Sequence, residues 1–252
     1  MNNLAVVLSG GGARGAIHLG VLQALYEHKI KIDAISGTSI GAIIGSLYCV
    51  GVKPFEIKEL MKSKSFRELF HFTWHRFGLL DMSKLKKILN EFIGKDSFES
   101  LKIPLHICVS NIDTGKYELF SKDKLFHKIA ASASIPIVFE PIKIGNSYYV
   151  DGGLFNNLPV EPFVGKYRNI LGIHVNNYKN NEDQSISAVA ERVVNLVIKQ
   201  NVTPNMEKCD YIINPYVDKK YSTLDFKNIE KLYDLGYKYG IVFAKKYMAE
   251  NN

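Results

Sequence analysis

The sequence lacks the features that mark membrane-spanning, secreted and zinc-binding proteins. No apolar run approaches the roughly eighteen residues that a membrane-spanning helix needs. The cysteines, Cys49, Cys108 and Cys209, are odd in number and lack the paired spacing of zinc sites, so we expect small buried side chains. No basic segment precedes a long apolar stretch at the N-terminus, so no secretory signal is expected. Together these absences predict a cytoplasmic protein with no metal and no organic cofactor.

Charge of one sign is not concentrated in any segment. Lysine and arginine number 32 against 25 aspartates and glutamates, which gives a net charge of +7, yet the basic residues are spread along the chain. A diffuse excess of this kind is typical of a solvated surface, and it also favours attraction to anionic lipid. We therefore expect no nucleic-acid partner and retain peripheral membrane contact as a hypothesis. Nothing in the sequence indicates an oligomeric state.

The sequence also contains no linker, internal repeat or low-complexity tract, so we predict one domain over residues 1–252. Strand and helix patterns alternate in the first third, which indicates parallel strands joined by crossover helices. Strands are expected at Leu4–Ser9, Ile32–Ser36, Pro104–Ile112, Ile170–Val175 and Asp210–Asn214, hairpins around 113–116 and over 141–150, and helices at Ala13–His28, Ser39–Val50, within 54–93, and at Lys122–Ala133, Ser185–Asn201 and Phe226–Met248. The predicted fold is α/β with a mostly parallel central sheet.

Ser39 is the strongest candidate for a nucleophile. It lies in GTSIG, between a strand pattern and a helix pattern, with Gly37 and Gly41 two residues away on either side. A strand-to-helix turn tight enough to lift a serine into a site leaves no room for a Cβ at these flanking positions. The following helix would also direct its N-terminal amides toward the serine. The alternative is an ordinary turn in which Ser39 caps the helix.

A second glycine-rich turn, SGGGARG at residues 9–15, follows the first strand pattern. Successive glycines expose backbone amides, and those of Gly11 and Gly12 are suited to bind the oxyanion of a tetrahedral intermediate. Gly10 and Arg14 complete the candidate oxyanion site, and Gly15 ends the motif. Arg14 would hold the loop in shape, face a phosphate, or lie exposed on the first helical turn, and the sequence does not separate these roles.

The proton acceptor for a catalytic serine is less obvious. Seven histidines are available: His18, His28, His71, His75, His106, His127 and His174. None lies in a recognisable loop context, so each is expected to be structural or exposed. Asp151 instead follows a strand pattern and precedes Gly152 and Gly153, which permit close backbone approach. A carboxylate can accept the serine proton if it bonds to the hydroxyl and is partly kept from water. DGG alone is more typical of a simple turn, but with the two glycine turns it favours Asp151 as the base.

Four ordered blocks resemble the patatin-like phospholipase family, in particular its compact bacterial members. They are SGGGARG at residues 9–15, GTSIG at 37–41, ASASIPIVFEPI at 131–142 and DGGLFNNLP from Asp151, and beyond Pro162 the similarity is only general. The resemblance implies a three-layer α/β/α fold and hydrolysis of lipid acyl esters. It also implies a catalytic dyad of Ser39 and Asp151 without histidine, and an oxyanion site near Gly11 and Gly12.

Three alternative functions are weighed against this hypothesis. GGGARG also satisfies the dinucleotide-binding pattern G-x-G-x-x-G, but Asp33, the acid about twenty residues on, would begin the second strand rather than end it. An α/β-hydrolase triad would use Ser39, Asp151 and His174, although a histidine inside LGIHVN is not in the late loop typical of that fold. A non-catalytic lipid-binding or regulatory module would keep the turns only for packing, and the intact serine and aspartate argue against it.

One aromatic segment, FRELFHFTWHRFGLL at residues 66–80, is a candidate for lipid contact. Its rings belong to Phe66, Phe70, Phe72, Trp74 and Phe77, and they alternate with arginines and histidines. This mixture suits a lipid interface, although packing in the core is the more frequent fate of such rings. We hypothesise that the segment borders the acyl-binding cleft. Serine at 72 and 74 would then weaken vesicle binding and spare hydrolysis of a short soluble ester.

Overall fold

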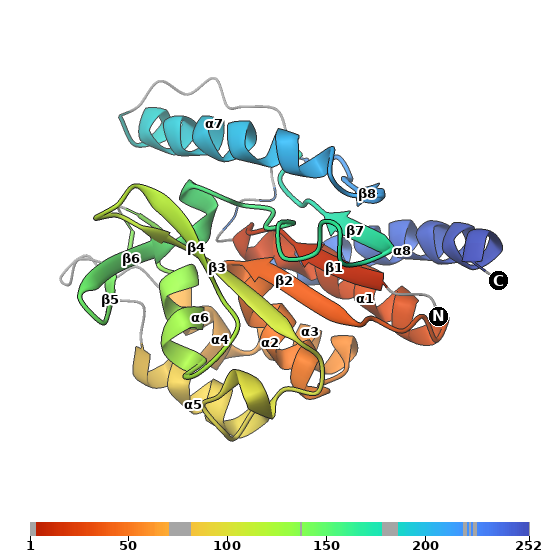
Figure 1. The fold of residues 1–252 in the computed structure, drawn as a ribbon, viewed down its shortest axis with the longest axis horizontal. Coiled ribbons are helices and arrows are strands. Elements are labelled where there is room, and N and C mark those ends of the chain that lie inside the picture. Colours follow the sequence, from red (N-terminus) through yellow and green to blue (C-terminus); the bar gives the residue numbers. More distant parts are fainter. Residues whose placement is uncertain are drawn as a thin grey trace.

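The computed structural model describes residues 4–70, 82–136, 138–177, 186–218, 221, 223 and 226–251. In this part of the chain one eight-stranded mixed sheet carries helices on both faces (Figure 1). The strands are β1 (Leu4–Leu8), β2 (Ala34–Thr38), β3 (Leu105–Asn111), β4 (Lys116–Phe120), β5 (Ile142–Ile144), β6 (Ser147–Asp151), β7 (Asn169–Ile173) and β8 (Tyr211–Ile213). The α-helices are α1 (Ala16–Glu27), α2 (Ile40–Val50), α3 (Pro54–Lys62), α4 (Lys64–Arg67), α5 (Met82–Phe92), α6 (Phe126–Ser132), α7 (Ile186–Met206) and α8 (Ile229–Asn251).

The sheet has a parallel centre and an antiparallel edge. The strand order is β5-β6-β3-β2-β1-β7-β8, with β4 paired to β3 outside this path. β1 is fully buried, as expected for a central parallel strand, and its last residue, Leu8, lies opposite Gly37 of β2 and Ile173 of β7. The next strand in the chain, β2, pairs with one edge of β1, whereas β7, much later in the chain, pairs with the other edge. The carboxyl end of β1 therefore lies at a topological switch point, where α/β proteins bind ligands.

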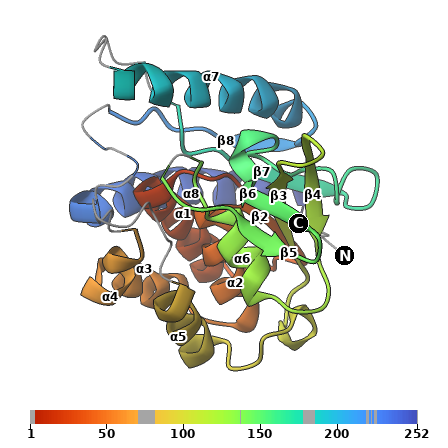
Figure 2. The same ribbon diagram turned by 90° about the vertical axis from the view of Figure 1, so that its left-hand side faces the viewer.

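Two hydrophobic clusters fill the spaces between the sheet and its helices. The larger cluster contains apolar residues of α1, α2 and α8, whereas the smaller one includes Val202 of α7 together with Phe163 and Ile170. Figures 1 and 2 show α7 on one face of the sheet and α1, α2 and α8 on the other. The three-layer α/β/α arrangement is therefore confirmed, and α8 closes the larger core against α1.

Most of the expected elements are present, with shifted ends. The strand before the Ser39 turn begins at Ala34 rather than Ile32, and α7 continues beyond Asn201 to Met206. Cys49 and Cys108 are buried, as expected, but Cys209 is only partly so. Among the helices that the structure describes, none combines the length and the apolar character needed to cross a membrane.

Candidate active site

The Ser39 turn has the tight geometry that its flanking glycines predict. Ser39 lies between β2 and α2 with a φ of 56° and a ψ of −123°, a strained conformation for a residue with a side chain. A Cβ on Gly37 would lie 2.5 Å from the carbonyl carbon of Gly41, and a Cβ on Gly41 would lie 2.4 Å from the carbonyl oxygen of Leu8. Only glycine fits at either position, because each contact is with rigid backbone.

Ser132, at the end of α6, supports this turn through its side chain. Its Oγ accepts a hydrogen bond from the backbone amide of Ser39 at 2.8 Å and donates to the carbonyl oxygen of Cys108 at 2.6 Å. The hydroxyl thus connects the turn to β3. Nothing in the sequence singles out Ser132, because both of its partners are distant along the chain.

Asp151 ends β6 and begins a 3-10 turn over Gly152–Leu154. Its Oδ1 accepts a hydrogen bond from the amide of Gly153 at 2.7 Å, and its own amide donates to the carbonyl oxygen of Ser134 at 2.8 Å. Burial raises the pKa of Asp151 to about 6, while hydrogen bonds from the Ser39 hydroxyl and the Gly153 amide oppose this rise. The structure therefore brings Ser39 and Asp151 together.

The remaining motif glycines are also closely packed, as the sequence predicts for Gly152 and Gly153. A Cβ on Gly152 would lie 2.4 Å from the carbonyl oxygen of Cys108, and one on Gly153 would lie 3.0 Å from Oδ1 of Asp151. A Cβ on Gly15 would lie 2.6 Å from Cγ1 of Ile40. Gly15 thus lets the glycine loop rest against the first turn of α2, beside the candidate nucleophile.

The glycine loop offers two amides rather than three. Gly10 donates its amide to Oδ1 of Asn157 at 3.1 Å, so it is already satisfied and does not fit the expected role of an oxyanion donor. Within the described part of the chain, the amides of Gly11 and Gly12 have no protein acceptor. Gly12 has a φ of 55°, and a Cβ there would lie 2.1 Å from the carbonyl oxygen of Thr223. The candidate oxyanion site is therefore narrowed to Gly11 and Gly12.

Arg14 holds the glycine loop rather than projecting from it. Its side chain is almost fully buried, so it is not the exposed charge that one interpretation of the sequence allows. Nε donates to the carbonyl oxygen of Tyr221 at 3.0 Å, and Nη1 donates to Oδ1 of Asn176 at 3.1 Å. Asn176 in turn donates to the carbonyl oxygen of Gly10 at 2.7 Å. These bonds favour the role of Arg14 in shaping the loop.

The histidines near the loop are directed to other partners. Nδ1 of His174 hydrogen-bonds to Oδ1 of Asn214 at 3.0 Å, and burial lowers the pKa of His174. His18 is fully buried, its Nε2 hydrogen-bonds to the carbonyl oxygen of Ser9 at 2.8 Å, and burial lowers its pKa to about 4. Among the described residues, neither histidine hydrogen-bonds to the Ser39 or Asp151 side chain. The geometry thus gives no support to a triad containing His174.

Asparagines of α7 fix the turn that follows Asp151. Oδ1 of Asn201 accepts from the amide of Asn157 at 2.9 Å, and its Nδ2 donates to the carbonyl oxygen of Gly153 at 3.1 Å. One turn later, Nδ2 of Asn205 donates to Oδ1 of Asn156 at 3.0 Å. These roles are not visible in the sequence, because asparagine is also an ordinary turn residue and α7 is distant along the chain.

Two sequence expectations outside this cluster are tested by the structure. Phe66 is fully buried and packs edge-on against Phe226, with ring centroids 6.0 Å apart, so this ring takes the core position that is the more frequent alternative to lipid contact. Phe72, Trp74 and Phe77, like the side chain of Phe70, lie outside the described residues. Asp33 pairs with Lys31 at 2.9 Å just before β2, at the opposite end of the strand from the Ser39 turn. This position does not suit a ribose-binding acid.

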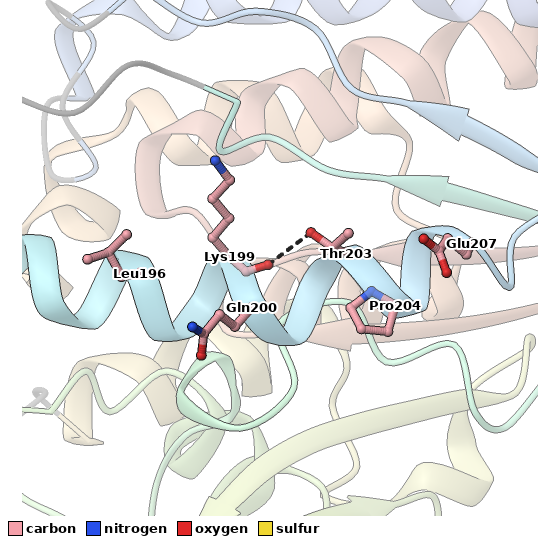
Figure 3. A pocket seen from close by; sticks show the side chains of 6 residues that line it. All are labelled: Leu196, Lys199, Gln200, Thr203, Pro204 and Glu207. Atoms are coloured by element: carbon pink, nitrogen blue, oxygen red, sulfur yellow. Dashed lines mark hydrogen bonds between the residues drawn. The ribbon is translucent and has the colours of Figure 1, made fainter.

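A shallow depression lies on α7, outside the Ser39 and Asp151 cluster (Figure 3). Its volume is about 420 Å³, and its lining residues are Leu196, Lys199, Gln200, Thr203, Pro204 and Glu207. Oγ1 of Thr203 donates to the carbonyl oxygen of Lys199 at 3.2 Å, where Pro204 interrupts the normal helical pattern (Figure 3). Neither Ser39 nor Asp151 lines it. In the part of the chain that the structure describes, no three metal-ligating side chains cluster either.

The relationship to known proteins follows from the same motifs. Residues 6–164 match the family model described as patatin-like phospholipase. The chain belongs to the patatin-like phospholipase family. The matched region contains the glycine loop, the Ser39 turn and the Asp151 turn, and it ends before β7, α7 and α8.

Relatives of this family member include much longer proteins. Neuropathy target esterase sws of Drosophila melanogaster is 28% identical over 286 residues, covering 98% of this chain and 19% of the relative. Lysophospholipase NTE1 of Saccharomyces cerevisiae is 27% identical over 280 residues, covering 96% of this chain and 16% of the relative. An NTE family protein of Mycobacterium bovis is 32% identical over 165 residues, covering 64% of this chain and 46% of the relative. The chain thus spans less than a fifth of the length of the two eukaryotic relatives.

Solved structures confirm the patatin-like fold. VipD from Legionella pneumophila superposes with a TM-score of 0.65 at 15% identity, covering 97% of this chain and 67% of that one. In the complex of ExoU with SpcU from Pseudomonas aeruginosa the TM-score is 0.54 at 16% identity, with coverage of 97% and 51%. Identities this low relate the folds alone.

Proposed function

We propose that this chain hydrolyses lipid acyl esters, with Ser39 as the nucleophile and Asp151 as its base. The observation that carries the proposal is the pairing of a serine on a strained turn with a buried carboxyl whose pKa is raised to about 6. Perturbed carboxyls beside a nucleophile are typical of catalytic sites, because a base works best when its pKa lies near the working pH. Proton acceptance by Asp151 is therefore favoured above a pH of about 6.

The proposed reaction uses two successive acyl transfers. Oγ of Ser39 attacks the ester carbonyl while its proton passes to Asp151, and the carbonyl oxygen becomes an oxyanion held by the amides of Gly11 and Gly12. The C–O bond to the alcohol then breaks, and Asp151 returns the proton to that leaving oxygen. Water, deprotonated by Asp151, attacks the acyl carbon; the bond from that carbon to Oγ of Ser39 then breaks, Asp151 returns the proton to Oγ, and the carboxylic acid leaves. Each step is assigned to groups of this chain, and the second regenerates Ser39.

The proposed substrate class is phospholipid or lysophospholipid. The family description and the lysophospholipase among the relatives support this class. We also propose peripheral contact with lipid, which the diffuse net charge of +7 supports. Sedimentation with anionic vesicles at low and high salt tests this contact, and equal sedimentation with neutral vesicles would contradict its electrostatic basis.

Labelling with a fluorophosphonate probe, together with fatty-acid release from lysophosphatidylcholine, tests the proposed nucleophile. Ser39→Ala should abolish both signals while the chain still folds. Ser46→Ala is the matched control, because Ser46 is a buried serine of α2 whose hydroxyl donates to the carbonyl oxygen of Ile43, in the same helix, at 2.8 Å. Labelling that survives in Ser39→Ala would reject the proposal. Absence of fatty-acid release in the wild type would favour a non-catalytic lipid-binding module.

The α/β-hydrolase triad is separated from this proposal by His174→Ala. Because Nδ1 of His174 is directed to Asn214, turnover should be close to that of the wild type. A loss comparable to that of Ser39→Ala would instead establish histidine as the base.

A further inference from the structure

Asn157 connects the glycine loop to the segment that follows Asp151. Its Oδ1 accepts the amide of Gly10 at 3.1 Å, and its backbone amide donates to Oδ1 of Asn201 at 2.9 Å. The residue is 2% exposed. It therefore joins, inside the protein, the two segments that the proposed function requires to face one another.

The neighbours of this amide group are the two proposed catalytic residues. A Cβ on Gly10 would lie 2.5 Å from Oδ1 of Asn157 and 3.1 Å from Cβ of Ser39. A Cβ on Gly153 would lie 2.9 Å from the same Oδ1 and 3.0 Å from Oδ1 of Asp151. The amide group of Asn157 thus lies beside both Ser39 and Asp151.

The side-chain nitrogen of Asn157, Nδ2, is buried and makes no hydrogen bond within the described part of the chain. Its orientation is fixed by chemistry, because exchanging oxygen and nitrogen would set two donors, Nδ2 and the Gly10 amide, against each other. The adjacent Asn156 differs: its Nδ2 donates to Glu161 at 2.8 Å, and its Oδ1 accepts from Asn205 at 3.0 Å.

We propose that Nδ2 of Asn157 is a further catalytic donor, which binds the oxyanion together with the amides of Gly11 and Gly12. Buried donors are rarely left unpaired in folded proteins, and one beside a nucleophile is suited to a charge that appears only during reaction. As Oγ of Ser39 bonds to the carbonyl carbon and its proton moves to Asp151, the carbonyl π electrons pass to oxygen. That oxygen accepts the hydrogen bond from Nδ2, which releases it when the C–O bond to the leaving alcohol breaks. This inference rests on the proposed function.

Asn157→Asp tests the donor separately from the structural contact. The carboxylate keeps an acceptor for Gly10 but removes the N–H, so kcat on a short p-nitrophenyl ester should fall about 100-fold while KM changes less than about threefold. The rate of fluorophosphonate labelling should fall by a similar factor. Asn176→Asp is the matched control: it makes the same chemical change on the residue that holds Gly10 through its carbonyl, and its kcat should fall less than about tenfold.

Asn157→Leu repeats the test without a new charge, and its kcat loss should match that of the aspartate variant. A kcat within about threefold of the wild type in either folded variant would overturn the proposal, as would a loss confined to KM or equal to that of Asn176→Asp. The kcat values of these variants are compared only for the activity that disappears in Ser39→Ala. Activity that persists in Ser39→Ala would instead contradict the proposed function, so the two failures are distinguished.

A measurement on the unaltered chain covers the case in which both variants fail to fold. The phosphonyl adduct on Ser39 places an anion-like oxygen where the oxyanion would form. In spectra of the ¹⁵N-asparagine-labelled chain, the side-chain NH₂ signal of Asn157 should move downfield when the adduct forms. An unchanged Asn157 signal in a fully labelled sample would overturn the proposal.

Discussion

The two turns proposed to carry the chemistry are held in place by different means. Around Ser39 both flanking glycines lie against backbone, because a Cβ at Gly37 or Gly41 would meet carbonyl groups at 2.4 to 2.5 Å, and Ser132 adds one side-chain hydrogen bond. The Asp151 turn has one comparable backbone contact, at Gly152, and is held in addition by side chains, with Asn201 of α7 bonded to Asn157 and Gly153. Sterics therefore dominate in the first turn, whereas a polar network contributes more to the second.

This difference shows why the two turns should tolerate mutation unequally. A steric constraint from backbone has no way to relax, since the atoms that a new Cβ meets belong to the strand and helix themselves. A side-chain hydrogen bond can be replaced in part by water or by small rearrangements. Substitution of the glycines that flank Ser39 should therefore be sharply destabilising, whereas loss of the side-chain bonds to the Asp151 turn should weaken that turn gradually.

The largest expected effect is that of Gly41→Ala. Its Cβ would lie 2.4 Å from the carbonyl oxygen of Leu8, so the free energy of unfolding should fall by more than about 3 kcal/mol. Gly45→Ala is the matched control in the same helix, because its Cβ would meet only side chains, at 3.1 Å and beyond. Urea titration of both variants measures the difference. Gly45→Ala should lie within about 1 kcal/mol of the wild type, and equal losses would break the comparison.

Asp151→Asn should change stability in the opposite direction while abolishing esterase activity. Because burial raises the pKa of Asp151 from 3.8 to about 6, the folded state holds this proton more tightly, and stability falls as the pH rises through that window. The neutral amide avoids a cost of about 3 kcal/mol above pH 6, and its advantage should vanish below pH 4. Chemical denaturation at pH 8 and pH 4 measures it.

The control for that prediction is Asp123→Asn, which removes a carboxylate from an exposed turn. It should show no comparable difference between the two pH values. If Asp151→Asn were less stable than the wild type at pH 8, the carboxylate would be stabilising its turn. The destabilisation expected from its burial would then be wrong.

The smallest expected effect is that of Asn201→Ala. Truncation removes the acceptor of the Asn157 amide and the donor to Gly153, so the free energy of unfolding should fall by about 1 to 2 kcal/mol. Activity should fall with it, because the Asp151 turn loses its support from α7. Thr203→Ala, on the exposed side of the same helix, is the control and should be near neutral. A loss as large as that of Gly41→Ala would remove the distinction between the two turns.

The sequence predicts the parts of this molecule whose requirements are local. Gly37, Ser39 and Gly41 lie within five consecutive residues, so the steric need for glycine is visible in the motif itself. The alternating strands and helices are likewise visible, because each pattern lies within its own element. The three-layer arrangement follows from that alternation and from the family resemblance.

What the sequence does not predict depends on partners distant along the chain. Asn157 looks like a turn residue until the structure places it against Gly10, and Ser132 looks like the end of a helix until it meets Ser39. The extension of α7 past Pro204 has the same origin, since the buried side chain of Asn205 holds the last turn. Tertiary contacts decide each of these features, and local propensity gives no sign of them.

The glycine loop also depends on chain beyond the region shared across the family. Matched residues stop at 164, yet Ser9 donates its amide to Ile173, Ala13 donates to Thr223, and one whole edge of β1 is paired by β7. A fragment trimmed to the matched region would contain all four signature blocks with a bare strand edge and an unsupported loop. The smallest portable unit that keeps the proposed site is therefore larger than the four blocks by which the family is recognised, and grafting experiments should include β7, the loop after it and Thr223.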